Sequence, residues 1–136
     1  MRLNRPACIV LAACCVGLLA TSLAFARVVN NTIDAVALVA DDGRHLVVTG
    51  PITCTAGERA ILHVTVTQRT TGALAEGQTL FVCSGARQEW EVHAATQGRE
   101  TFELGSATAV AVARTSVPGD TTDAHQWLVP ITLVAE

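Results

Sequence analysis

Four histidines are spread along this sequence, and histidine is the side chain that most readily binds a metal or moves a proton near neutral pH. They are His45, His63, His93 and His125. None has the paired spacing of a metalloprotease helix or a zinc finger. His63 and His93 fall on outward positions of expected strands, so they would meet only if those strands were neighbours. Solvated surface histidines are the simpler interpretation, and we expect no metal and no cofactor.

Carboxylates and hydroxyls offer two further kinds of chemistry. Glu89 and Glu91 share one face of an expected strand at a separation of about 7 Å, which a glycosidase carboxylate pair can have. Charged residues on the outside of a strand explain this pair more simply. Ser84, Ser106 and Ser116 do not stand in the G-x-S-x-G pattern of a hydrolase nucleophile. The sequence therefore predicts no catalytic residues and no enzyme.

The first 26 residues have the pattern of a secretory signal peptide. Arg2 and Arg5 precede a long uncharged stretch that ends in small residues at Ala26, so we expect a helical leader (1–26) that is removed there. A second motif, LAAC ending at Cys14, resembles a bacterial lipoprotein signal, but the chain after it stays apolar instead of becoming a polar tether. Secretion is the favoured interpretation. A surface protein lipidated at Cys14 and an uncleaved anchor are the alternatives.

Cleavage after Ala26 leaves a single domain over residues 27–136. Cys54 and Cys83 are the two cysteines of this part, and such a pair predicts one disulfide bond in an oxidising compartment. All 12 acidic residues but only seven of the nine basic residues lie here, which gives a formal charge of −5. Without a basic cluster we expect no nucleic-acid partner, and no later apolar run is long enough to span a membrane.

After the leader, Val- and Thr-rich stretches alternate with turn signals, as in all-β sandwiches and barrels. Asp42-Gly43 predicts a tight hairpin rather than a calcium loop, and Val117–Asp120 predicts another turn. No stretch has the periodicity of a helix. We expect an antiparallel, immunoglobulin-like β-sandwich of about seven strands. The expected strands cover residues 32–40, 45–53, 60–69, 78–84, 87–94, 101–114 and 125–135.

Alternation of apolar and polar residues assigns the two faces of most of these strands. Pro51 predicts a bend or bulge after Gly50, and Pro130 predicts an edge strand or an amide side that faces solvent. The residues that we expect to face the core are Leu62, Val64, Val66, Trp90, Val92, Trp127, Val129, Ile131 and Leu133.

The stretch 101–114 allows two interpretations of its alanines. Phe102, Leu104, Val110 and Val112 fall on one side of it, and Glu103, Gly105 and the alanines at 107, 109, 111 and 113 fall on the other. If the first set faces the core, the alanines form a flat outer strip that could receive a partner strand. The simpler interpretation is a central strand buried on both faces, or an alanine content that reflects only base composition.

The succession CTAG, VTVTQRTTG, FVCSG, QEW and DAHQWLVPITL resembles small exported proteins of actinobacteria that have no assigned function. The resemblance covers most of the chain after the leader, but its motifs are turn and core residues. It implies an exported sandwich with one disulfide, and it brings no catalytic or ligand residues with it.

These observations predict an exported, non-catalytic β-sandwich module that binds a partner or has a structural role at the cell envelope or outside the cell. Its expected partner is an unidentified protein or envelope component. A small secreted hydrolase or enzyme inhibitor is a further alternative, which would require several polar side chains that converge in a deep pocket.

Overall fold

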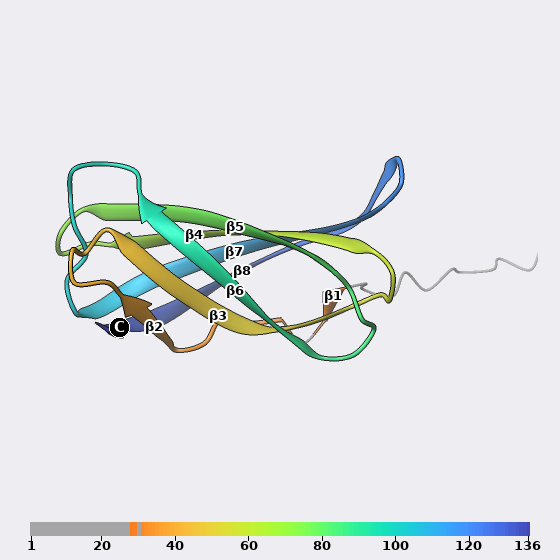
Figure 1. Cartoon of the computed structure of the whole chain (residues 1–136), viewed down its shortest axis with the longest axis horizontal. Helices are drawn as coiled ribbons and strands as arrows, with labels where there is room; N and C mark the ends of the chain where they lie inside the picture. Colours follow the sequence, from red (N-terminus) through yellow and green to blue (C-terminus); the bar gives the residue numbers. More distant parts are fainter. Residues whose placement is uncertain (1–27, 30) are drawn as a thin grey trace, which may run out of the picture.

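The computed structural model describes residues 28–29 and 31–136 of the chain. These residues contain strands and no helix, so the all-β prediction is confirmed (Figure 1). The expected leader, with Cys14 and Ala26, lies outside the described residues. Within them, no helix is long and apolar enough to cross a membrane. The strands are β1 (Val28–Val29), β2 (Val36–Val39), β3 (His45–Cys54), β4 (Arg59–Gln68), β5 (Ala73–Val82), β6 (Gln88–Thr96), β7 (Gly105–Val117) and β8 (Asp120–Ala135).

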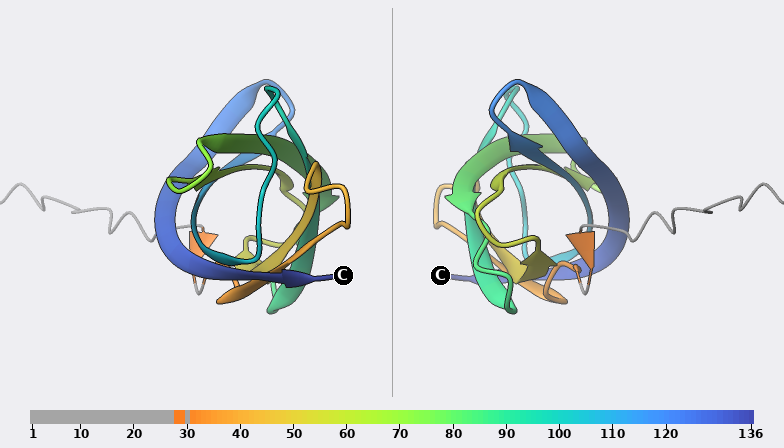
Figure 2. Two further views of the ribbon diagram at one scale, coloured as in Figure 1. Left: turned by 90° about the vertical axis from the view of Figure 1, so that its left-hand side faces the viewer. Right: turned by 90° about the vertical axis from the view of Figure 1, so that its right-hand side faces the viewer.

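The strands form one sheet that closes on itself as a seven-stranded barrel (Figure 2). Around the barrel the order is β2, β8, β7, β4, β5, β6 and β3, and β1 adds to the end of β3. Two pairings between strands distant in sequence complete the ring. β3 pairs antiparallel with β6 from His45 to Ile52, and β2 pairs in parallel with β8. The predicted immunoglobulin-like sandwich is therefore wrong, because a twisted sheet has curled until its edges meet instead of stacking as two layers.

Apolar side chains from every second residue of the strands fill the inside of the barrel. The inward positions predicted on β4, β6 and β8 are confirmed, with Trp127 and Val129 partly buried and packed against the others. Trp90 is buried, and its Nε1–H donates a hydrogen bond to the carbonyl oxygen of Pro51 at 3.3 Å. The core therefore lies in the interior of one closed sheet.

The alanine row of β7 faces this interior. Ala109, Ala111 and Ala113 are completely buried, while Val110 and Val112 are half-buried on the outside. The alternative in which these valines face the core and the alanines form an outer strip is therefore wrong. The alanines face inward because the space inside the barrel is limited. Ala111 lies directly between Val64 of β4 and Trp127 of β8, and its small side chain leaves room for these two larger neighbours.

The alternation of faces changes phase just before β7. Phe102 is buried as predicted, but Leu104 is 64 % exposed, and the inward residues afterwards are odd-numbered. The residues before Gly105 are not in a strand, and Gly105 has a φ of +124°, which side chains rarely adopt. A strand with one phase over 101–114 is therefore the wrong interpretation, because the regular alternation begins only at Gly105.

The buried side chain of Gln68 fixes this irregular segment. Its Nε2 donates to the carbonyl oxygens of Glu103 at 2.9 Å and Ser106 at 3.3 Å, and its Oε1 accepts from the backbone N–H of Glu103 at 2.9 Å. These bonds supply hydrogen-bond partners to backbone groups of Glu103 and Ser106 that are not paired with a neighbouring strand.

The two prolines behave differently. The N–H of Thr132 donates to the carbonyl oxygen of Ala35, on the side of β8 that faces away from β7. Pro130 lies two residues earlier in the same strand, so its nitrogen points to that side as well. β8 is not an edge strand, because it pairs with both β7 and β2, so the other alternative predicted for Pro130 holds: its nitrogen lies on a side of β8 where no strand pairs with it. The bulge predicted at Pro51 is not found, because β3 pairs with β6 without a shift there. The nitrogen of Pro51 faces the chain before β2, whose Thr32 N–H donates to the Pro51 carbonyl, so no ladder bond is lost.

Turns and a disulfide complete the framework. Cys54, at the end of β3, is bonded to Cys83, just after β5, which confirms the predicted pair. The hairpin at Gly43 (φ +64°) and the turn at Gly119 (φ +92°) are also confirmed. β5 begins at Ala73, earlier than predicted, because a tight turn ends in the bond from Gly72 N–H to the Gln68 carbonyl.

Candidate functional site

Strands β5, β4, β7 and β8 lie side by side and turn one row of alternating side chains each toward solvent. We call this outer surface the four-strand face. It carries several exposed aliphatic side chains: Leu80 and Leu128 are each 63 % exposed, and Ile61 is 46 % exposed. The remaining members of its apolar set are Leu74, Val82, Val110 and Val112.

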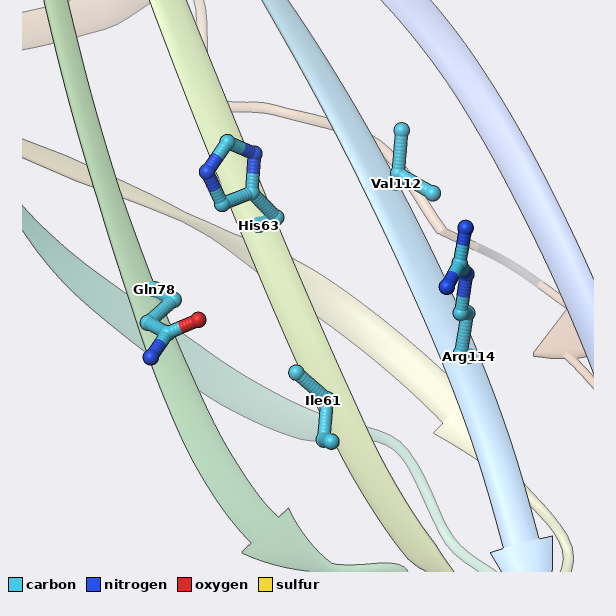
Figure 3. A pocket seen from close by; sticks show the side chains of 5 residues that line it. All are labelled: Ile61, His63, Gln78, Val112 and Arg114. Carbon is cyan, nitrogen blue, oxygen red and sulfur yellow. The ribbon is translucent and has the colours of Figure 1, made fainter. Parts of the chain in front are cut away.

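The strand register brings a mixed group of side chains together at the centre of this face. His63 of β4 lies opposite Gln78 of β5 on one side and Val112 of β7 on the other. One step along β4, Ile61 lies opposite Arg114 of β7. These five side chains surround an open hollow of about 320 Å³, in which Ile61 and Val112 form the apolar part (Figure 3).

A second hollow of about 250 Å³ continues from the first toward the edge of β5. It shares Ile61 and Gln78 with the first hollow and adds Thr79 and Leu80. Together the two hollows run across three strands, from Arg114 on β7 to Leu80 on β5. An elongated ligand or an extended peptide segment could lie along this path.

The basic side chains of the four-strand face have no acidic partners within residues 28–29 and 31–136. Among the described residues, the side chains of Arg59, His63 and Arg114 take part in no hydrogen bond or ion pair. The acidic residue on the neighbouring part of the face is Glu76, which lies opposite Thr65 and is separated from Arg114 along the strands. The face is therefore apolar with unpaired positive charge.

Strands β6 and β3, which follow β5 around the barrel, are arranged differently. Arg87 donates to Glu89 at 3.3 Å, and His93 Nε2 lies 2.8 Å from Glu91 Oε1. The predicted position of both glutamates on one outward face is confirmed, and each is occupied by a neighbouring base on its own segment. Nothing in this arrangement frees the two carboxylates to act together on a sugar.

The other chemical candidates are dispersed. His63 on β4 and His93 on β6 are separated by β5, and no group of three metal-ligating side chains occurs in the described part of the chain. Of the three serines considered for catalysis, Ser84 lies in the loop after β5, and Ser106 and Ser116 lie near opposite ends of β7. The structure does not bring a serine, a histidine and an acid together from this set.

The Asp41–Gly43 turn has a local structural role. The backbone N–H of Arg44 donates to Asp42 Oδ1 at 2.8 Å, which lowers the pKa of this carboxyl below its ordinary value, and the nearby His45 ring lowers it further. The hydrogen bond from Arg44 to the ionised Asp42 carboxylate therefore stabilises the folded state at pH values above the ordinary pKa of aspartate. This stabilisation is lost as the pH falls through the lower pKa of the folded state. The hairpin turn predicted between β2 and β3 is confirmed.

Sequence reasoning singled out His63 but not Ile61, Gln78, Val112 or Arg114. Each of the four is an ordinary outward residue on its own strand, and only the order β5–β4–β7 makes them neighbours. The outward position of Val112 could not be found from the alternation either, because the pattern over 101–114 left open which of its two sides faces the core.

Neither a known protein family nor a characterised protein matches this chain. The resemblance to exported actinobacterial proteins therefore stays a prediction.

Proposed function

We propose that this chain is an exported, non-catalytic binding module that acts at the cell envelope or outside the cell, and that it binds its partner through the four-strand face. The observation that carries the proposal is the combination on this face of exposed aliphatic side chains with three basic side chains that have no partner within the part of the chain that the structure describes. Isolated exposed apolar residues are common on monomers, but a contiguous patch of them marks an interaction surface.

Export is the part of the proposal that rests on the leader and the disulfide. The signal-peptide pattern before Arg27 and the bond between Cys54 and Cys83 support an oxidising compartment. A lipid-anchored form through Cys14 is the second candidate, favoured by the LAAC motif alone. Both forms display the same barrel and the same face.

A binding role is supported over catalysis by how the polar residues are distributed. The interior of the barrel is filled mainly by aliphatic and aromatic side chains. The polar groups of the central hollow are one guanidinium, one imidazole and one amide on an open surface. Such a set recognises charge and shape, whereas a hydrolase needs a nucleophile, a base and a place to stabilise a developing charge.

Photo-crosslinking in the organism that makes the protein tests this proposal. A benzoylphenylalanine at Leu80 is expected to form a discrete crosslinked species in the exported fraction, because Leu80 is exposed on the four-strand face and lines its second hollow. The matched control carries the same group at Leu38 of β2, an exposed leucine that lies across the ring of strands from β4 and β5. Equal crosslinking at both positions, or none at Leu80, would refute the proposed face.

The intact mass of the uncrosslinked protein reports the compartment. We expect a start at Arg27, and a diacylglyceryl-modified Cys14 would indicate the anchored form.

A further inference from the structure

We infer that the two joined hollows of the four-strand face form a site for a monoanionic amphiphile, a carboxylate attached to an unbranched apolar chain. This inference rests on the proposed function, because it names what the same face binds.

The anionic head group follows from Arg114. Its guanidinium lines the first hollow and has no partner among the described residues. Arginine presents a planar fork of N–H donors that fits a carboxylate with two parallel hydrogen bonds. His63 and Gln78, which line the same hollow, supply further polar atoms for a bound carboxylate.

A single negative charge fits this site better than a polyanion. Arg114 is the one guanidinium of the first hollow, so it complements one unit of charge. The part of the chain after the leader carries a formal charge of −5, which repels multiply charged ligands at long range. Phosphorylated or nucleic-acid ligands are disfavoured on the same ground.

The apolar chain follows from what surrounds the guanidinium. Ile61 and Val112 lie beside it in the first hollow, and the second hollow leads across Ile61 to the exposed side chain of Leu80. The path from β7 across β4 to β5 crosses two inter-strand spacings, or about 10 Å. A medium-length alkyl chain covers this distance and removes exposed aliphatic surface from water.

The joint size of the hollows is consistent with this ligand class. The first hollow alone, at about 320 Å³, is at the lower end of the range for small-molecule sites, about 300–1,000 Å³. Because the site is an open surface rather than an enclosed pocket, a flexible chain that can follow the strands fits it better than a rigid ring system. We expect moderate affinity, since part of the bound chain stays in contact with water.

Two probes with the same tail and opposite head charge test the inference. The exported protein, labelled with ¹⁵N, is titrated with decanoate and separately with decyltrimethylammonium, both below the concentrations at which they form micelles. Decanoate is expected to shift the backbone amide signals of Ile61, His63, Gln78 and Val112 in a saturable way. Decyltrimethylammonium is expected to leave these signals in place.

Matched variants identify the groups responsible. Arg114→Gln is expected to weaken decanoate binding about tenfold, whereas Arg87→Gln, in the loop after β5 and outside both hollows, is expected to leave it unchanged. Ile61→Ser should weaken the binding of decanoate but leave Arg114 in place. The ligand-free spectrum of each variant shows whether the barrel is still folded, and both residues are exposed enough that we expect it to be.

Equal shifts with both probes would overturn the assignment of a carboxylate, and decanoate shifts confined to another surface would overturn the site. No saturable shift at all would overturn the ligand class. In each case a crosslink specific to Leu80 would leave the proposed binding function standing. Conversely, loss of that crosslink with normal decanoate binding would contradict the function while supporting the site.

Discussion

Replacement of both Cys54 and Cys83 by serine is expected to lower the free energy of unfolding by about 3 to 4 kcal/mol. The bond joins residues 29 positions apart, and closing a loop of this length restricts the unfolded chain by that amount in the chain-entropy model. Both cysteines are buried where the ends of β3 and β5 meet, so the folded barrel also loses a direct covalent link between them. A loss of this size is a large part of the stability of about 5–15 kcal/mol that is typical of a small domain.

Equilibrium unfolding in urea, followed by tryptophan emission, measures this loss. The double alanine variant is the control for the polarity of serine, and it should lose a similar amount because the effect acts mainly through the unfolded chain. Trp90 is buried and Trp127 is partly buried, so the emission should shift to longer wavelength on unfolding. A loss below about 1 kcal/mol in both double variants would contradict a stabilising role for the bond.

Gly50→Ala and Gly77→Ala are each expected to lower the free energy of unfolding by about 3 kcal/mol. A Cβ on Gly50 would lie 2.3 Å from the carbonyl oxygen of Thr32 and 2.6 Å from the ring of Trp90. A Cβ on Gly77 would lie 2.3 Å from the carbonyl oxygen of His93 and 2.9 Å from the Cα of Ala94. Since both positions oppose backbone atoms, a flexible side chain cannot simply move away, and the wall of the barrel must shift.

These glycines lie where the closing segments of the barrel approach most closely. At Gly77 the chain of β5 passes directly over β6, although the ladder between the two strands is limited to Ala75–Glu76 and their partners. At Gly50 the chain before β2 passes over β3. The cost of a methyl group there thus measures how tightly the barrel is closed.

Thermal unfolding provides the measurement for the glycine variants, with a shift of about 4 °C or more per kcal/mol expected for a domain of this size. Gly98→Ala is the matched control, because its Cβ would meet only the end of the Glu100 side chain, and we expect a change within about 0.5 kcal/mol. Near-native stability of both Gly50→Ala and Gly77→Ala would argue against the close approach of these segments.

The local part of the fold could be predicted from the sequence because it depends on neighbouring residues. Strict alternation on β4 and β6 assigned their inward and outward residues correctly, and glycine with aspartate located the hairpin at Gly43. The two cysteines that follow the leader were enough to predict the disulfide. Each of these features depends on residues that lie within about ten positions of one another, except for the disulfide bond between Cys54 and Cys83.

The closure of the barrel could not be predicted, because it depends on which distant strands pair. The parallel pairing of β2 with β8 joins the two ends of the described chain, and nothing in either strand specifies it. The alanines of β7 were ambiguous for the same reason. Whether a small residue faces the core or the solvent depends on the size of the residues opposite, here Leu62 and Val64, and those are known only once the strand order is known.

The candidate site depends on the same long-range order. Arg114 and Gln78 are 36 positions apart in the chain, and they line one hollow because β4 lies between their strands. A hollow on an outer sheet surface leaves no motif in the sequence, unlike a metal site or a nucleophile elbow. His63 was recognised from its residue type alone, and its neighbours were not.

The most direct test of the account is a lysine footprint of the four-strand face. The chain contains no lysine, so a single introduced lysine provides one amine besides the amino terminus. Gln78→Lys places this amine in the hollow. We expect it to be acylated about tenfold more slowly in the freshly exported material than in the purified protein freed of its partner. A tenfold difference corresponds to a face that is occupied in about nine-tenths of the molecules. Gln97→Lys, in the loop after β6, should react at the same rate in both. If Gln78→Lys also reacts at one rate in both preparations, the four-strand face is free in its native setting, and the proposed binding role is contradicted.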